Sequence, residues 1–389
     1  MTPILRAGIL ALLLVAIDGC GGSPGSTGGD DAALDGSSVG LDGGALRPDA
    51  SASVDAATAA DAALRVDAAV AADAATPTGP AIPAPPAGTA YWGAWINGDQ
   101  DSATEEQQTQ AFEALAGRGL ALHMHYYGWT SAFASSADMQ ADLAHHRTPV
   151  VTWSCGPDNA AVSSGSADAV LAAATASVKK FGAPMFIRWN WEMNLTGGNK
   201  CMGADGAAGF IAAWRYIHDY FKSAGVTNVA WLWNPARSST DGKDAAQYWP
   251  GAKYVDWIGF DGYDKSDFAD TDAAHAFSDV FQPFYDFYTT STYFKNGAPM
   301  SVLIAETGEC QASASSPAIQ QNYVAEVVSD LAAGKFPKVG GFMYFDAPGS
   351  YASCPYAPQG GWIFDAFGGR TAFITMGQSA AFAATVPGS

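Results

Sequence analysis

The chain has 389 residues, a formal net charge of −19 and 12% aromatic residues. The negative charge argues against nucleic acid and anionic membrane surfaces as partners, because both would be repelled. Composition divides the chain unequally, since residues 1–90 contain no Phe, Trp, Tyr or His. All 12 Trp, 15 Tyr and 20 Phe therefore fall in the remaining 299 residues, and only that part can build a large hydrophobic core.

The N-terminus has the pattern of an export signal. Arg6 precedes an apolar run over residues 7–17, which is too short to span a bilayer. The run ends in Ile17-Asp18-Gly19-Cys20, which resembles a bacterial lipobox, although Asp18 is unusual at its position. We expect residues 1–20 to be a lipoprotein-type signal peptide with lipidation at Cys20; ordinary signal cleavage nearby is the alternative. The protein is then expected in the cell envelope, lipid-anchored to the outer membrane or cell surface, or outside the cell.

Residues 21–89 consist mainly of Ala, Gly, Asp, Ser and Pro. The triplet Asp-Ala-Ala recurs every six residues from Asp55 to Asp73, a spacing that does not place the aspartates on one helical face. The segment is acidic and ends in a proline-rich stretch, so we expect a disordered, solvated linker. One folded domain is expected to follow over residues 90–389.

In this domain, short β-branched or aromatic runs alternate with amphipathic helical patterns, in chain order from Tyr91 onward. Eight such repeats in roughly 300 residues are typical of a single (β/α)8 TIM barrel. An open doubly wound sheet would have fewer strands and a glycine-rich phosphate turn, which the sequence lacks. The expected strands cover residues 91–96, 121–129, 149–154, 184–190, 229–234, 255–263, 301–306 and 341–346. The expected helices cover residues 103–118, 137–146, 166–181, 207–224, 273–288, 317–333 and 371–384, and the connection after the fifth strand is only weakly helical.

Four cysteines follow Cys20, and an even number in an exported chain indicates two disulfides with three possible pairings. In a barrel, Cys155 and Cys201 belong to the neighbouring loops after strands three and four. Cys310 and Cys354 stand in the same relation after strands seven and eight. We therefore predict the pairs Cys155–Cys201 and Cys310–Cys354, because the alternatives would cross the mouth of the barrel.

Two glutamates stand at the ends of two predicted strands. Glu192 follows the fourth strand, and Glu306 ends the apolar run of the seventh. In a barrel, the C-terminal ends of the strands carry the chemistry. Two carboxyl groups that face each other across a sugar are what glycosidic bond cleavage needs, with one as acid and the other as nucleophile or base.

Several neighbours are expected to support these glutamates. Period-two alternation places Arg188 and Asn190 on the face of Glu192. Trp189 and Trp191 flank Glu192 as apolar walls, which raise a carboxyl pKa toward that of a usable acid.

On the sixth strand, alternation groups Asp261 with Tyr263. The hydroxyl of Tyr263 would there hydrogen-bond the nucleophile; an aromatic plug of the barrel fits the pattern equally well. Glu309 competes with Glu306 for the nucleophile's role, but it follows Gly308 and is expected to have left the strand.

The motifs resemble glycoside hydrolase family 26, the family of endo-β-mannanases with some mixed-linkage glucanases and β-1,3-xylanases. The likeness lies in Arg-x-x-x-Glu-Met-Asn, Trp-x-x-Asn-Pro, the block Pro250–Tyr263 and Ile-Ala-Glu-Thr-Gly. It implies a retaining mechanism with Glu192 as acid/base, Glu306 as nucleophile and Tyr263 supporting the nucleophile. The chain departs from the family at Trp191, where His is common, and at Tyr344-Phe345, where Trp is frequent. These departures concern the substrate more than the reaction.

His123-x-His125 on the second predicted strand has a spacing that binds metal in other hydrolases. A catalytic metal would need further ligands on several other strands, and the other four histidines fall in predicted helices. We therefore expect no metal, and a substrate contact or an inner hydrogen bond for His123 and His125.

The expected protein is an exported, tethered and monomeric retaining endo-β-glycanase without a cofactor, which binds a β-linked polysaccharide or oligosaccharide and touches a membrane only through its lipid anchor. Endo-β-1,4-mannanase activity on plant mannans is favoured over a β-1,3-1,4-glucanase, a β-1,3-xylanase or a barrel that binds carbohydrate without cleaving it. Aromatic residues at strand ends would stack on sugar faces. The expected substrate-binding or supporting residues are Tyr263, Arg188, Asn190, Trp191, Trp233, Asn234, His125, Trp129 and Phe345, with Trp95, Trp153, Trp231 and Trp362 as further candidates for stacking.

Overall fold

The structure is a computed structural model that describes residues 82–96, 104–195, 205–237, 243–264, 276–309, 318–346, 369–383 and 385–389. All of them belong to one compact unit, Ala72–Ser389. The predicted signal peptide, Cys20 and most of the predicted linker lie outside the described residues. Among the helices that the structure describes, none combines the length and the apolar character needed to cross a membrane.

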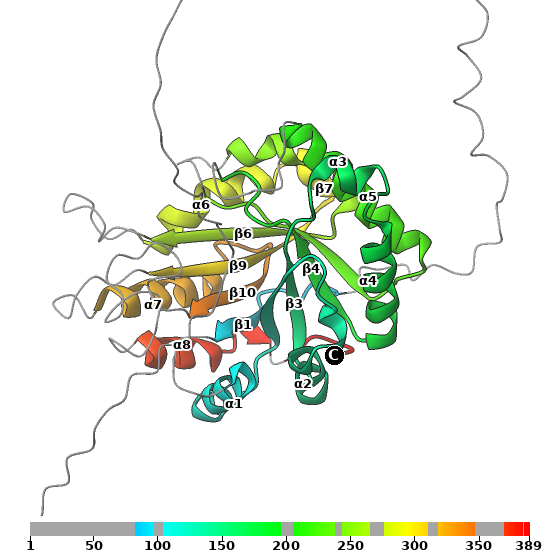
Figure 1. Cartoon of the computed structure of the whole chain (residues 1–389). Coiled ribbons are helices and arrows are strands. Elements are labelled where there is room, and N and C mark those ends of the chain that lie inside the picture. The colour runs from blue at the N-terminus through cyan, green and yellow to red at the C-terminus, as the bar shows by residue number, and fades with distance from the viewer. Residues whose placement is uncertain are drawn as a thin grey trace, which may run out of the picture. The chain divides into compact units, whose positions relative to one another are not determined.

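A closed barrel of eight parallel strands forms the centre of the molecule (Figure 1). Neighbouring strands pair in chain order, and the last strand pairs with the first. The predicted (β/α)8 barrel is therefore confirmed. Its strands are β1 (Ala90–Ile96), β2 (Leu122–Tyr127), β3 (Thr148–Trp153), β4 (Met185–Trp189), β5 (Val229–Trp233), β6 (Trp257–Asp264), β9 (Ser301–Glu309) and β10 (Val339–Asp346). Outside the barrel, β11 (Phe382–Ala383) adds to β1, and β7 (Phe294–Lys295) and β8 (Ala298–Pro299) form a hairpin.

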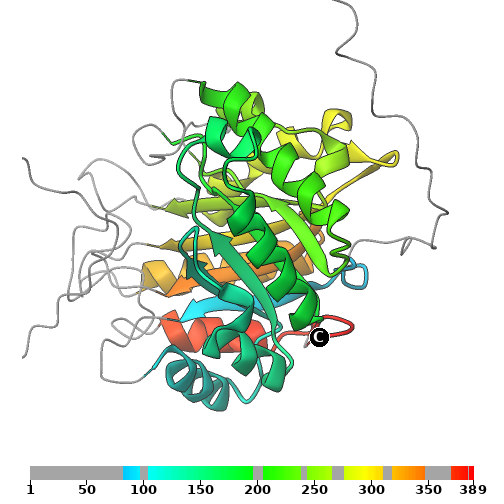
Figure 2. The same ribbon diagram turned by 45° about the vertical axis from the view of Figure 1, so that its right-hand side comes forward.

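Helices surround the strands on the outside of the barrel (Figures 1 and 2). All seven expected helices occur, and six of them have ends shifted by at most four residues. The last, expected over residues 371–384, ends at Gly377, and residues 382–383 of its expected range form β11 instead. They are α1 (Glu105–Ala116), α2 (Ala137–His145), α4 (Asp168–Phe181), α5 (Gly206–Ser223), α6 (Phe277–Tyr288), α7 (Ala318–Ala332) and α8 (Gly369–Gly377), with a short additional α3 (Asn159–Ser163). After β5 the chain forms two 3-10 helices, η2 (Lys243–Tyr248) and η3 (Ala252–Tyr254), while η1 (Phe133–Ser135) and η5 (Ser291–Tyr293) precede α2 and β7.

The strands separate two hydrophobic clusters, because successive side chains of a strand point to opposite faces. The inner cluster fills the barrel with residues such as Met124, Phe186 and Leu303. The outer cluster lies between strands and helices and holds residues such as Trp153 and Trp214. Any side chain that is to reach the mouth of the barrel must therefore lie on the inner face of its strand.

One irregularity in β9 changes which side chains face inward. The pairing of β6 with β9 is regular up to Phe260 opposite Ile304, but the next pair is Asp261 opposite Glu306. Ala305 is thus an extra residue, a β-bulge, and bulges re-aim the side chains that follow them. Glu306 consequently faces the same side as Asp261. β9 then continues to Glu309, so the expectation that Glu309 has left the strand is wrong.

Residues 82–89, which were expected in the linker, are part of the barrel domain. The side chain of Ile82 is fully buried in the inner cluster. Its backbone oxygen accepts a hydrogen bond from Trp257 Nε1 (3.1 Å), and the next residue, Pro83, accepts one from the Tyr91 hydroxyl (3.1 Å). Trp257 begins β6, so Ile82 closes the N-terminal end of the barrel. The predicted boundary between 89 and 90 is therefore too late, because one isoleucine among Ala and Pro gave no sequence signal.

We predict that Ile82→Ala lowers the free energy of unfolding by about 2–4 kcal/mol, because it removes buried methyl groups and leaves a cavity that the barrel cannot collapse around. Urea unfolding monitored by tryptophan fluorescence measures the effect. Leu143→Ala is the control, since Leu143 is 37% exposed and its truncation should cost far less. Equal losses for the two variants would show that Ile82 does not close the barrel.

Candidate active site

The carboxylate of Glu306 stands at the centre of the site and is 5% exposed. Its Oε1 accepts hydrogen bonds from the hydroxyl of Tyr126 on β2 (2.6 Å) and from Nη2 of Arg188 on β4. Its Oε2 accepts one from the hydroxyl of Tyr263 on β6 (2.6 Å). Donors from three strands therefore fix both oxygens of this side chain on the inner face of the barrel.

Arg188 lies beneath Glu306 and is fully buried. Its Nη1 donates to both carboxylate oxygens of Asp261 (3.2 and 3.0 Å), and its Nε donates to Thr152 Oγ1 (2.5 Å). Burial alone would lower the pKa of Arg188, but the carboxylates of Glu306 and Asp261 outweigh burial and raise it. The sequence placed Arg188 under Glu192; the structure pairs it with Glu306 and Asp261 instead.

Asp261 is also buried, and one guanidinium has to balance two carboxylates. Burial and then the negative charge of Glu306 raise the pKa of Asp261 well above its usual value, while Arg188 opposes this rise. Between them, Asp261 and Glu306 compete for the same positive charge. Asp261 is thus the carboxyl group of the site that is driven toward its protonated form.

The two tyrosines that contact Glu306 are held in their neutral form. Burial and then the charge of Glu306 raise the pKa of both Tyr126 and Tyr263 well above the usual value. Each hydroxyl therefore keeps its proton and donates it in a hydrogen bond to the carboxylate. Tyr126 was not identified from the sequence as a site residue. Strand alternation, which places it on the same inner face as Leu122 and Met124, could have indicated it.

Glu192 lies in a turn after β4 and not on the strand, which ends at Trp189. Asn190 and Glu192 both adopt left-handed backbone conformations, with φ of 51° and 55°. Such conformations cost energy in residues other than glycine and persist where neighbours over-determine them. Here the backbone N–H of Asn190 donates to the backbone oxygen of Trp153 (2.9 Å). The backbone N–H of Glu192 donates to the backbone oxygen of Asn234 (2.8 Å). The turn is thereby tied to the ends of β3 and β5.

Asn194 holds the far end of the same turn. Its Nδ2 donates to the backbone oxygen of Ala236 (2.8 Å) and to Asp244 Oδ2 (2.9 Å). Its Oδ1 accepts from the amide of Ala236 (2.9 Å). The Asn of the Glu-Met-Asn motif therefore positions the segment that carries Glu192, a role that the motif alone did not reveal.

The turn brings Glu192 close to the buried pair. One carboxylate oxygen from each of Glu192, Asp261 and Glu306 lies within 4.8 Å of the others. Carboxyl groups about 5–5.5 Å apart suit direct nucleophilic attack on a sugar, whereas about 6.5–9.5 Å leaves room for an intervening water. The arrangement thus favours a half-buried acid facing a fixed nucleophile.

Aromatic rings border the carboxylates. The ring of Trp191 lies 5.6 Å from that of Tyr126 and 5.7 Å from the Arg188 guanidinium. The ring of Phe345 on β10 lies 5.8 Å from that of Tyr263 and 4.7 Å from that of Trp95. Of the expected contacts, Trp191, Phe345 and Trp95 are therefore brought to the site.

Other expected tryptophan contacts point away from it. Trp233 is fully buried in the outer cluster, where its Nε1 donates to the backbone oxygen of Tyr248 (3.1 Å). Trp189 stacks on Phe210 of α5 (5.6 Å), so it forms no wall for Glu192. These predictions are wrong because strand alternation turns both side chains outward. In the outer layer, Trp153 stacks with Trp129 (4.6 Å) and Trp231 packs on helix α5, so none of these three joins the site, and Trp362 lies outside the described residues.

Asn234 and His125 also differ from expectation. Asn234 is buried, and its side chain lowers the pKa of Asp261, so it supports the site without facing the substrate. Its side chain fills the space above Gly259, where an added Cβ would stand 2.1 Å from Asn234 Oδ1. His125 lies on the outer face of β2, because Met124 and Tyr126 face inward, and it contacts no inner residue of the site.

Of the four cysteines in the predicted disulfides, Cys155 alone lies within the described residues. Cys201, Cys310 and Cys354 lie outside the described residues. The pairs Cys155–Cys201 and Cys310–Cys354 therefore stay predictions.

Residues 157–334 match the family Glycosyl hydrolase family 26. Endoglucanase H of Acetivibrio thermocellus is 29% identical over 179 residues, which are 44% of this chain and 19% of that protein, so the chain spans about a fifth of this curated relative. Two solved structures share the fold. A β-mannanase from a symbiotic protist of the termite Reticulitermes speratus, complexed with gluco-manno-oligosaccharide, superposes with a TM-score of 0.53 and 18% identity over 81% of this chain and 99% of that one. The GH26C protein of a Muricauda species has a TM-score of 0.54 and 14% identity over 76% and 87%.

The raised pKa of Asp261 predicts how its neutral substitute behaves. A carboxyl group whose pKa is raised on folding makes the folded state bind more protons, so its contribution to stability falls as pH rises above the unfolded pKa of about 3.9. Asp261→Asn removes this dependence. We expect the free energy of unfolding of Asp261→Asn to rise relative to that of the wild type as pH increases from 4 to 7, because only the wild type loses stability over that range.

Denaturant unfolding at several pH values measures this change, with Asp286→Asn on the exposed face of α6 as the control. A constant difference between Asp261→Asn and wild type across the range would contradict the raised pKa.

Proposed function

The chain belongs to glycosyl hydrolase family 26, and from that premise we propose that it hydrolyses β-glycosidic bonds within polysaccharide chains, with retention of anomeric configuration. The observation that carries the proposal is the approach of Glu192 and Glu306, whose carboxylate oxygens lie within 4.8 Å. That spacing fits a double displacement through a covalent intermediate. One carboxyl group is fixed by three donors and the other lies on a half-buried turn, so the two are suited to different roles.

In the first step, Glu306 attacks the anomeric carbon and Glu192 donates a proton to the leaving glycosidic oxygen. The bond between the anomeric carbon and that oxygen breaks as the bond to the carboxylate forms. Oε1 of Glu306 accepts from Tyr126 and Arg188, whereas the one donor to Oε2 among the described residues is Tyr263. Oε2 therefore keeps the freer lone pair for the new bond. The product is a glycosyl-enzyme ester and a free reducing-side sugar.

In the second step, Glu192 takes a proton from a water molecule that attacks the anomeric carbon. The ester bond breaks, and Glu306 returns to a carboxylate held again by its three donors. Each attack inverts the anomeric carbon, so two attacks restore the original configuration. The fixed tyrosines and Arg188 stabilise the negative charge that returns to Glu306 without having to reorient.

We propose a β-1,4-mannan as the polymer. Support comes from the solved relatives, among which the termite-protist protein is a β-mannanase with a bound gluco-manno-oligosaccharide. A neutral polymer also suits a chain with a net charge of −19. A glucanase is the second candidate, because the curated relative is an endoglucanase. Trp191 and Phe345 border the carboxylates and depart from the family's usual residues. Their side chains would contact the sugar and so contribute to substrate specificity.

The N-terminal sequence supports a location for this activity. A short apolar run that ends in Cys20 and a long acidic linker suit export followed by lipid anchoring. We propose that the barrel acts as a monomer at the cell surface or in the envelope, held away from the membrane by the linker.

Substitution of the two glutamates should separate their roles. Glu306→Ala should abolish hydrolysis of polysaccharide, since no covalent intermediate can form. Glu192→Ala should also fail on polysaccharide, but on an aryl glycoside with an acidic phenol it should give a burst of phenol and accumulate the intermediate. Azide should rescue Glu192→Ala with a retained glycosyl azide and Glu306→Ala with an inverted one. NMR of the glycosyl azides determines their anomeric configuration. The opposite pattern would mean that Glu192 is the nucleophile and Glu306 the acid/base.

The substrate proposal is checked by product profiles on polymers and on manno-, gluco- and xylo-oligosaccharides. We expect kcat/KM on β-1,4-mannan to exceed that on mixed-linkage β-glucan and β-1,3-xylan by at least about tenfold, which corresponds to roughly 1.4 kcal/mol of transition-state discrimination. Short internal fragments should appear early, as endo cleavage requires. Faster cleavage of glucan or xylan would show that this polymer, and not mannan, is the substrate. Binding without cleavage would show that the barrel binds carbohydrate but is not an enzyme.

A further inference from the structure

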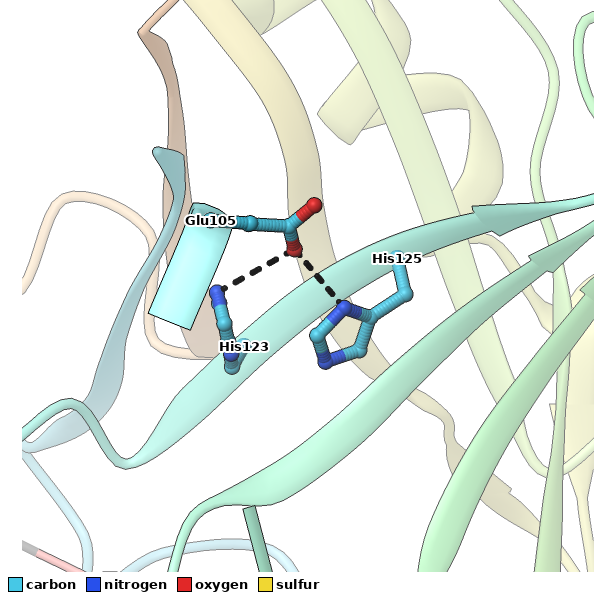
Figure 3. A group of neighbouring side chains, drawn as sticks. All are labelled: Glu105, His123 and His125. Atoms are coloured by element: carbon cyan, nitrogen blue, oxygen red, sulfur yellow. Dashed lines mark hydrogen bonds and ion pairs between the residues drawn. The ribbon is translucent and has the colours of Figure 1, made fainter. Parts of the chain in front are cut away.

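A second cluster of ionisable side chains lies on the outer face of β2, between the barrel and helices α1 and α2. His123 and His125 project from the strand, and Glu105 is the first residue of α1 (Figure 3). Oε1 of Glu105 lies 2.8 Å from His125 Nδ1 and 3.7 Å from His123 Nε2. One ligand atom from each of the three residues lies within 4.8 Å of the others. The three side chains thus converge on one point from two elements.

Asp142 of α2 holds both imidazoles from behind. Its Oδ1 lies 2.7 Å from His123 Nδ1, and its Oδ2 lies 2.6 Å from His125 Nε2. A carboxylate accepts hydrogen bonds and donates none, so each ring directs an N–H toward Asp142. In the neutral rings, the lone pair of His125 Nδ1 then faces Glu105 Oε1 (2.8 Å), and that of His123 Nε2 lies between Thr109 Oγ1 (3.2 Å) and Glu105 Oε1 (3.7 Å). Metal-ligating histidines are oriented in this way, by a carboxylate on the nitrogen that does not bind the ion.

We propose that Glu105, His123 and His125 bind a divalent transition-metal ion of the Zn²⁺ type. Tetrahedral Zn²⁺ with ligands at about 2.0–2.1 Å separates its ligand atoms by roughly 3.3 Å. The two separations from Glu105, 2.8 and 3.7 Å, bracket this value, and the two imidazole nitrogens lie within 4.8 Å of each other, so shifts of at most about 1.5 Å complete the site. The side chain of Glu105 is 29% exposed, which leaves an opening for the ion and for water as a further ligand.

The charge around the cluster also favours a cation. Asp142, Glu106 and Glu113 all pair with Arg147, so three carboxylates share one guanidinium before Glu105 is counted. An ion with two positive charges would balance this excess of carboxylates.

The ion would have a structural role. Glu105 is held at the start of α1 by a capping box, in which Thr104 and Gln107 exchange hydrogen bonds (2.8 and 3.2 Å). Its carboxylate would join the beginning of α1 to the middle of β2. From the sequence we considered His123-x-His125 as a metal motif and rejected it, because we sought the further ligands on other strands. In the structure, Glu105 and the supporting Asp142 come from helices.

The test uses the full chain, purified with a tag that contains no histidine and freed of metal by a chelator. Calorimetric titration with ZnCl₂ should show one equivalent bound. Co²⁺ should give the visible absorption bands of a four- or five-coordinate site. Zn²⁺ at a hundredfold excess over Kd should raise Tm by about 4 °C. If the protein binds no metal, or if its Tm does not change when Zn²⁺ is added, the proposal is wrong.

Variants locate the ion. Glu105→Gln keeps the size of a partly exposed side chain and leaves the capping box intact, and it should weaken Zn²⁺ binding at least tenfold. If circular dichroism shows that Glu105→Gln misfolds, Glu105→Asp is tested in its place. His145→Gln is the matched control, since His145 also faces a carboxylate, Glu106 (3.4 Å), but lies outside the cluster. It should bind as the wild type does. Glu192→Gln should also bind normally, and loss of binding there, or an unchanged Kd in Glu105→Gln, would place the ion elsewhere.

Discussion

The buried guanidinium of Arg188 is the constraint on which the candidate active site depends. A charge inside the barrel is tolerated only if it is paired and hydrogen-bonded, and Arg188 finds its partners on two different strands, in Glu306 and Asp261. Loss of Arg188 would leave two carboxylates buried together without a positive charge between them. The same contacts that make Arg188 tolerable fix Glu306, so the stability of the barrel interior and the position of the proposed nucleophile are set together.

Two departures from regular backbone geometry bring the carboxylates together. In an uninterrupted β9, alternation would turn Glu306 away from the face that carries Leu303; the bulge at Ala305 turns it inward. Glu192 reaches the site from a turn with left-handed residues, which Asn194 and the backbone of β5 hold in place. Strain of this kind is stored where the surrounding structure over-determines it. Here that surrounding structure is the set of loops at the C-terminal ends of the strands.

Strand β2 serves both proposed sites through its two faces. Tyr126 faces inward and donates to Glu306, whereas His123 and His125 face outward toward Glu105 and Asp142. The period-two alternation of a strand keeps the two groups of side chains apart although they are adjacent in sequence. An ion bound outside the barrel would restrain the β2 backbone, which also positions Tyr126 inside it. The outer cluster and the candidate active site are thus connected through β2, although no residue belongs to both.

The sequence by itself determined the barrel, because the alternation of strand and helix patterns is local and repeats along the chain. It also determined the two glutamates and Tyr263, since polar residues at strand ends are local signals too. Tertiary structure decided the rest. Barrel closure brought Tyr126 and Arg188 to Glu306, the register of β9 chose its face, and Ile82 became core only beneath Trp257. Trp233 and His125 were misplaced because inward or outward direction depends on strand phase and on where each strand ends, and both are set by partners distant in sequence.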